Sequence, residues 1–242
     1  EGGQMKRTLV AAWVVGICMM GWGVEARAQQ VTSLIRVNTD DTAAYLAWAE
    51  ESLPILMAAR ADSLTMGVCV PMFGAEQEGD LYVWTTTPSF AAALSADRND
   101  PAVAREIAKV APIRTVVSND LMTTIKPGGA ASQAAGSTFS MLALTVDTDQ
   151  VDLYITLVTK LEEAVHQNGF PDVNFAASNI MTGEFAGRIS VRVTAPTAER
   201  LGAFLDANGS ESWATEIMRQ FPGIRSIVQQ RVNSCRVNAV QQ

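Results

Sequence analysis

Two cationic and two aromatic side chains of this 242-residue sequence could together bind a small organic ligand. They are Arg36, Tyr82, Trp84 and Arg192. Each lies in a β-rich segment where apolar and polar residues alternate, so each is expected on the face opposite the apolar set. An aromatic and cationic lining suits a flat organic acid or an aromatic ligand. Alternatively, these side chains only fill an internal interface, with each arginine paired to a carboxylate such as Asp147.

Metal-binding residues are scarce, because the sequence holds one His and three Cys. The acidic segment 147–152 hints at a calcium loop. It lacks the required Gly at the sixth position and has Val151 at the fifth. Helix capping by Asp149 explains these carboxylates more simply, and the segment 38–41 is the same cap in repeat 1. We therefore expect no metal site.

Other catalytic motifs are missing as well. The sequence has no glycine-rich phosphate loop, no Cys-x-x-Cys motif and no Ser/His/Asp set with a plausibly placed His. Its 25 acidic and 18 basic residues give a net charge of −7, which argues against nucleic acid and against an anionic membrane surface. We expect neither partner.

Residues 5–28 have the layout of a secretory signal peptide. Lys6 and Arg7 precede an apolar run, and Ala26 and Ala28 stand at the −3 and −1 positions of a cleavage site. An uncleaved membrane anchor is the alternative, although the run is short for a span of roughly 20 residues. The sequence therefore predicts an exported protein, periplasmic or secreted, that is soluble after cleavage. Cys69 and Cys235 remain in a compartment that permits disulfides.

The rest of the chain reads as two copies of one unit. Residues 37–40 and 146–149 match, and three further pairs of segments follow in the same order at a spacing of about 110 residues. The glycine- and alanine-rich segment 127–137 is typical of a linker. We expect repeat 1 at 31–126 and repeat 2 at 138–236.

Each repeat is predicted to have the element order β-α-β-β-α-β. In repeat 2 the expected strands are 139–146, 173–181, 188–194 and 224–232, and the expected helices are 149–165 and 211–220. Repeat 1 follows the same plan, with middle strands at 64–73 and 81–86. This is the split β-α-β pattern of ferredoxin-like units, an α+β fold.

The duplicated ferredoxin-like pattern resembles the dimeric α/β-barrel superfamily, in which two such sheets close into a barrel. That superfamily includes antibiotic-biosynthesis monooxygenase-like proteins and chlorite-dismutase-like haem proteins. The resemblance implies a pseudo-dimeric α/β barrel with the four candidate ligand-binding side chains pointing inward. It also implies that the second strand of one copy neighbours the last strand of the other, so Cys69 and Cys235 could form a disulfide. Two buried free thiols are the alternative.

A haem would need an inward-facing histidine as its axial ligand. His166 lies on the polar side of its helix, beside Glu162 and Glu163, and is expected to face water. We therefore expect no cofactor.

Two functions remain open. The first is a non-enzymatic exported protein that binds a small organic ligand or a partner protein. The second is a cofactor-independent, monooxygenase-like enzyme acting on a small aromatic or quinol substrate between the repeats. The lack of an inward His or free Cys favours the first. A purely structural role with a filled core is a third possibility.

Overall fold

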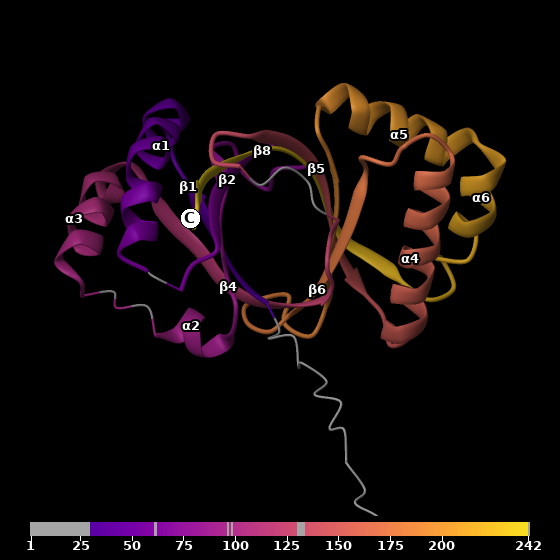
Figure 1. The fold of residues 1–242 in the computed structure, drawn as a ribbon, viewed down its shortest axis with the longest axis horizontal. Helices are drawn as coiled ribbons and strands as arrows, with labels where there is room; N and C mark the ends of the chain where they lie inside the picture. Colours follow the sequence, from indigo (N-terminus) through magenta and orange to yellow (C-terminus); the bar gives the residue numbers. More distant parts are fainter. Residues whose placement is uncertain (1–29, 61, 96, 98, 130–133, 242) are drawn as a thin grey trace, which may run out of the picture.

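Eight antiparallel strands close into a barrel that both repeats build together, in the order β1-β3-β2-β8-β5-β7-β6-β4. The structure, a computed structural model, describes residues 30–60, 62–95, 97, 99–129 and 134–241. Figure 1 looks down the barrel and shows α1 to α3 on one side and α4 to α6 on the other. The predicted α+β barrel of two ferredoxin-like units is confirmed. The expected signal peptide at 5–28 lies outside the described residues.

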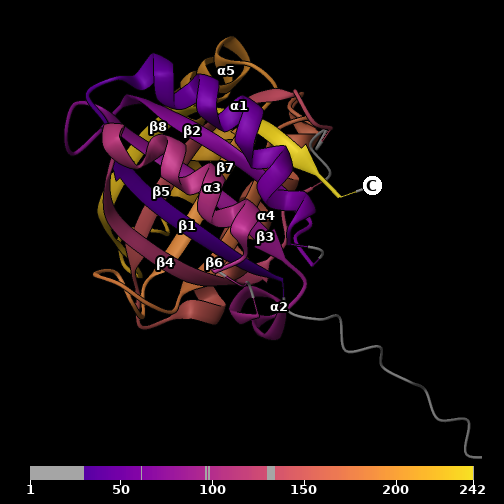
Figure 2. The same ribbon diagram turned by 90° about the vertical axis from the view of Figure 1, so that its left-hand side faces the viewer.

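Repeat 1 follows the predicted order, with one additional helix and a 3-10 turn. Its elements are β1 (Val31–Asn38), α1 (Thr42–Ala58), β2 (Thr65–Phe73), β3 (Asp80–Thr87), α2 (Phe90–Leu94), α3 (Pro101–Val110), η1 (Ala111–Ile113) and β4 (Thr115–Lys126). Figure 2 shows α1 and α3 crossing the outer face of this half-barrel, with the short α2 at one end.

Repeat 2 repeats this plan with a longer helix in place of α2. Its elements are β5 (Thr138–Asp147), α4 (Val151–Gln167), β6 (Asn174–Ile180), β7 (Ile189–Ala195), α5 (Ala198–Ser210), α6 (Ser212–Met218) and β8 (Ser226–Val240). Helix α5 was not predicted, because only Leu201 and Phe204 of it are buried and the sequence around Gly209 resembles a turn. Strand β8 also continues past residue 232, where we expected the last strand to end.

The predicted alternation of apolar and polar residues along the strands is confirmed in both repeats. In repeat 1, Val37, Leu81 and Val83 lie under the helices and contact Tyr45 and Leu53 of α1 in one apolar cluster. The equivalent cluster of repeat 2 contains Val146, Ile189, Val191, Tyr154 and Leu161. Each half-barrel therefore buries its outer face against its own helices, and the opposite face is left for the barrel interior.

The predicted capping of α4 by Asp149 is wrong. Its N-cap is Gln150, which makes no side-chain cap hydrogen bond. The Thr148 hydroxyl instead accepts from the Gln150 backbone N–H and donates to the Ile224 carbonyl, 2.6 Å away. Asp41 does cap α1, by accepting from the Ala44 backbone N–H at 2.9 Å. The turn places Asp149 before the N-cap position, where its carboxylate does not reach the first helical N–H groups.

Two seams join the repeats, β2 with β8 and β4 with β6, both antiparallel. At the first seam Cys69 is paired with Cys235, and the two residues form a disulfide. Among the described residues, no helix has the length and hydropathy needed to cross a bilayer.

Candidate functional site

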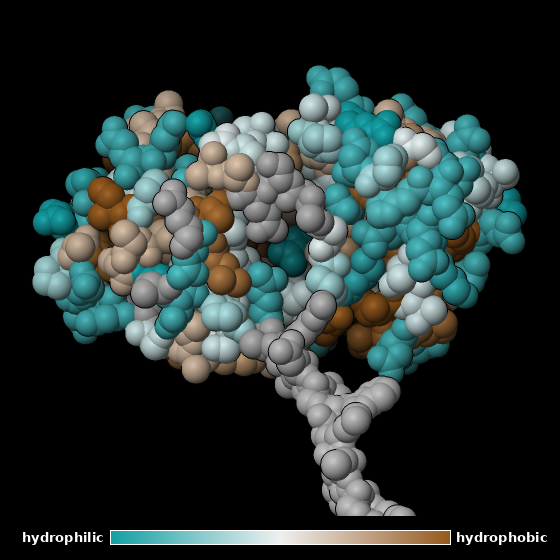
Figure 3. Space-filling model, in the orientation of Figure 1, coloured by the Kyte–Doolittle hydropathy of each residue, from teal (hydrophilic) through white to brown (hydrophobic). Residues whose placement is uncertain are grey.

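Solvent reaches the inside of the barrel. Along β7 the residues Ile189, Val191 and Val193 are buried against the helices, whereas the intervening Arg192 and Thr194 are partly exposed. Because β7 has a neighbour on each side and helices over its outer face, that exposure arises on the inner face. Figure 3 shows the surface hollowed between the two halves, with hydrophilic atoms at the bottom. An eight-stranded barrel of this kind is wide enough for one small ligand.

Trp84 and Arg192 lie on opposite walls of this interior. Trp84 of β3 pairs with Leu34 of β1, and Arg192 of β7 pairs with the equivalent residue of β5, Ala143. Strands β3 and β7 are four places apart in a closed ring of eight, so they are diametrically opposed. The repeat relationship puts the two residues at the same level of the barrel.

Arg192 is a cation without an ion pair among the described residues. Its Nη2 donates to Ser178 Oγ at 3.1 Å, and its buried Nε has no hydrogen-bond partner there. Burial lowers the pKa of Arg192. A guanidinium nevertheless stays charged at neutral pH, so the positive charge persists inside the barrel.

Trp84 is held against the backbone of β2. A Cβ on Gly67 would lie 2.4 Å from Cζ2 of the indole, so only glycine leaves room for this ring position. The indole N–H is buried and has no hydrogen-bond partner in the described part of the chain. A buried indole N–H normally has one, so this donor is available to an acceptor on a ligand or a water.

Arg36 differs from Arg192 because two carboxylates neutralise its positive charge. It pairs with Asp80 at 2.8 Å and with Glu76. Burial alone would raise the pKa of Asp80, but hydrogen bonds from Asn38 and Arg36 outweigh it and lower that pKa. The suggested partner, Asp147, is far from this arginine in the strand order and lies 3.8 Å from Arg188 instead.

Tyr82 stacks beneath a third interior arginine. The Arg231 guanidinium lies 4.0 Å from the centre of the Tyr82 ring. Burial raises the pKa of the Tyr82 phenol, so its hydroxyl stays protonated at neutral pH. Within the described chain this hydroxyl has no hydrogen-bond partner, and neither has the side-chain amide of the fully buried Asn233.

The four predicted residues therefore divide into two groups. Arg36 and Tyr82 are cross-strand neighbours in one layer, and Trp84 and Arg192 face each other in the next. The sequence interpretation missed Arg231 and Asn233. Polar residues at every second position from Gln229 could have identified this inner face, since Arg231 lies within the strand expected at 224–232 and Asn233 directly after it.

The single His of the sequence is not part of the barrel interior. His166 lies on α4, half-buried, with Nε2 2.8 Å from the Val173 carbonyl oxygen. Among the described residues no group of three His, Cys, Asp or Glu is arranged to hold a metal ion.

No protein-family model and no curated protein matches the chain. Solved structures do match it, over nearly its whole length. A "putative monooxygenase" from Lactobacillus acidophilus NCFM is 12% identical with a TM-score of 0.60, covering 88% of this chain and 97% of its own. An anthrone oxidase-like protein is 10% identical with a TM-score of 0.59, covering 90% and 96%. A DypB variant of Rhodococcus jostii RHA1, in complex with heme, is 11% identical with a TM-score of 0.50, covering 86% and 93%. These likenesses establish the dimeric α/β-barrel fold.

The described residues of the barrel interior include no histidine and no free thiol that could serve as an axial haem ligand. His166 is outside the barrel and bonded to the backbone, and Cys69 and Cys235 are bonded to each other. Arg192 and Trp84 instead offer hydrogen-bond donors to an organic ligand.

Proposed function

We propose that this protein is exported and binds a small aromatic acid, without catalysis, between Trp84 and Arg192 inside the barrel. The observation that carries the proposal is the Arg192 guanidinium, which is partly buried inside the barrel, charged and without a carboxylate partner among the described residues. A partly buried charge without a counter-charge is costly, and an anionic ligand would remove that cost.

The opposite wall suits the rest of such a ligand. A ring lying against the Trp84 indole would contact an aromatic face, while its carboxylate accepts from the Arg192 guanidinium. Arg36 already has its counter-ions, so Arg192 is the better anchor.

Binding is favoured over catalysis because the described interior residues include no imidazole and no free thiol for proton transfer or nucleophilic attack. No His lies there, both cysteines of the described chain are in the disulfide, and Tyr82 stays protonated. General acid–base and nucleophilic mechanisms need such a group near its working pKa.

Calorimetric titration with benzoate and with its uncharged analogue benzamide tests the proposal. Benzoate should bind, benzamide should bind far more weakly, and Arg192→Gln should weaken benzoate binding about tenfold or more, because a charge-assisted hydrogen bond is lost. Arg219→Gln, an exposed residue after α6, is the matched control and should change nothing. Equal binding of benzoate by both variants would rule out Arg192 as the anchor.

A second candidate is a cofactor-independent oxygenase acting on a small aromatic or quinol substrate. The specific observation is the likeness of fold to the Lactobacillus protein and to the anthrone oxidase-like protein. Oxygen uptake with a quinol that is lost in both Trp84→Ala and Arg192→Ala would establish this activity and replace the binding proposal.

Export is part of the proposal and has its own support. Residues 5–28 have the three-part layout of a signal peptide, and a disulfide persists best in an oxidising compartment. Intact-mass analysis of the protein from periplasm or medium should find the mature chain starting at Gln29.

The remaining alternative is that the barrel binds a partner protein in place of a small ligand. Such a partner would co-purify with this protein, and added benzoate would not release it.

A further inference from the structure

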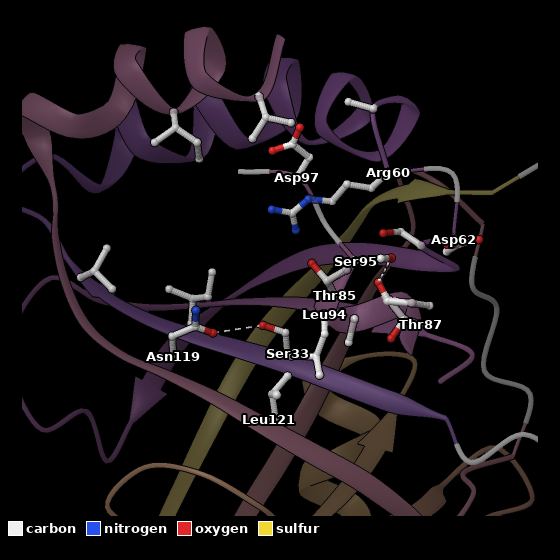
Figure 4. A pocket seen from close by; sticks show the side chains of 18 of the residues that line it. Ser33, Arg60, Asp62, Thr85, Thr87, Leu94, Ser95, Asp97, Asn119 and Leu121 are labelled. Carbon is white, nitrogen blue, oxygen red and sulfur yellow. Dashed lines mark hydrogen bonds between the residues drawn. The ribbon is translucent and has the colours of Figure 1, made fainter. Parts of the chain in front are cut away.

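A second cavity lies outside the barrel, on the outer face of repeat 1. Its volume is about 920 Å³, and it is a half-open cavity between the sheet of β1, β3 and β4 and the helices α2 and α3. Figure 4 shows Ser33, Thr85 and Asn119 on the strands at its floor. The equivalent space in repeat 2, over Leu142 and Val193, measures only about 180 Å³. The two repeats therefore differ in how much space they leave between the sheet and its helices.

The helical wall explains part of this difference. Ser89 caps α2 and Thr197 caps α5 at equivalent positions, but α2 has 5 residues and α5 has 13. Leu201, four residues after the cap of α5, is 2% exposed and fills the core. The equivalent residue of α2 is Ala93, which lines the cavity.

The floor explains the rest. In repeat 2 the paired residues Leu142 and Val193 are buried and apolar. The equivalent pair of repeat 1 is Ser33 and Thr85, and both line the cavity. Ser33 Oγ donates to Asn119 Oδ1 at 3.1 Å, which leaves the Asn119 amide N–H groups facing the same floor. Ser33 and Thr85 are partly exposed, so their hydroxyls face the cavity as polar groups where repeat 2 has a buried apolar pair.

The charges around the cavity balance. Two arginines and two aspartates line it, namely Arg60, Asp62, Asp97 and Arg114. Arg114 is also engaged elsewhere, since it lies over the Trp48 ring and bonds to the Tyr45 hydroxyl at 3.4 Å. Apolar side chains such as Ile35, Val103 and Ile107 make up much of the remaining wall. Because the positive and negative side chains around the cavity are equal in number and much of its wall is apolar, the cavity does not select for a charged ligand.

We propose that this cavity is a binding site for an uncharged, largely apolar organic molecule that carries a hydroxyl, carbonyl or amide group. The polar group hydrogen-bonds to Ser33, Thr85 and Asn119, and the apolar part lies against α2 and α3. The volume is within the roughly 300–1,000 Å³ typical of small-molecule sites. The site is separated from Trp84 and Arg192 by the sheet itself, so it does not depend on the function proposed for the barrel interior.

Fluorescence titration with N-phenyl-1-naphthylamine, a neutral probe, tests the site on the whole protein. We expect saturable binding with a blue shift, and about a tenfold loss of affinity in Ala93→Leu, which restores the bulk found in repeat 2. Ala91→Leu is the matched control, because Ala91 is on the same helix, exposed and outside the cavity lining. Unsaturable binding, or equal affinity in these two variants, would overturn the proposal.

A competition experiment tests the polar floor. 1-Naphthol should displace the probe at a lower concentration than 1-methylnaphthalene, and the double variant Ser33→Ala/Thr85→Val should reduce this preference about fivefold. An unchanged preference would contradict the assigned role of the floor. Arg192→Gln should leave all these values unchanged, whereas a loss of probe binding in Arg192→Gln would place the probe in the barrel interior and overturn the second site.

Discussion

Trp84 and Arg192 occupy the same position in the two repeats and face each other across the barrel. Duplication placed an aromatic ring in one copy and a cation in the other at one structural position. The two side chains differ from Arg36 and Tyr82, which already have a charged or stacked neighbour. Their available donors make this pair the centre of the candidate site.

Replacing Arg192 and Arg36 by methionine should have opposite effects on stability. Arg192→Met removes a charge without an ion pair, so the free energy of unfolding should rise by about 1 kcal/mol. Arg36→Met leaves the buried Asp80 without its cation and should lower that free energy by about 3 kcal/mol. Urea denaturation of both variants measures the two effects. A destabilised Arg192→Met would indicate that the charge is compensated in the folded protein.

Gly67→Ala should destabilise the protein and displace Trp84. The added Cβ would lie 2.3 Å from the Arg236 carbonyl oxygen and 2.4 Å from the indole, so the free energy of unfolding should fall by about 2 kcal/mol. Tryptophan fluorescence should change at the same time. Gly209→Ala is the control, because its Cβ meets nothing within 4 Å in α5, and it should stabilise by about 0.5 kcal/mol.

Cys69 and Cys235 should carry no free thiol in protein purified from an oxidising compartment. Mass analysis with a thiol-reactive reagent, without reductant, checks this directly. The bond closes a segment with a sequence separation of 166. Loss of the bond in Cys69→Ser/Cys235→Ser should lower stability by up to about 5 kcal/mol, because the unfolded chain gains freedom. Two alkylated cysteines in the untreated protein would dispose of the bridge.

Asp80 should make stability depend on acid pH. Its pKa is below the ordinary value of 3.8 in the folded protein, so its contribution is present at neutral pH and is lost as the pH falls through that lowered pKa. The wild type should therefore lose more stability between pH 7 and pH 3 than Asp80→Asn does. Urea midpoints at the two pH values give the comparison, and equal losses would contradict the lowered pKa.

The strands and their faces could be predicted from the sequence because the same alternation of apolar and polar residues occurs at matching positions of both repeats. Tyr82 and Trp84 were placed opposite the apolar set, and the structure places them in the barrel interior. The partners of Arg36 could not be predicted, since Glu76 lies in the turn between β2 and β3 and Asp80 at the first position of β3. Helix α5 was missed because its buried residues are too few to give a helical pattern.

The second cavity, on the outer face of repeat 1, could not be predicted from the sequence either. Ala93, Ser33 and Thr85 are ordinary residues for a helix and two strands, and only their comparison with Leu201, Leu142 and Val193 reveals the missing volume. The spacing of the repeats gives these equivalences, but it does not show that the three side chains border one space between the sheet and α2.

The two seams of the barrel are unequal in strength. The β2–β8 seam pairs residues from Thr65 to Phe73, with two register shifts, and is joined by a disulfide, whereas β4 and β6 pair only from Met122 to Lys126, with one register shift. We therefore expect thermal fluctuations to separate β4 from β6 more often than β2 from β8. Amide hydrogens along β6 should exchange sooner than those along β2.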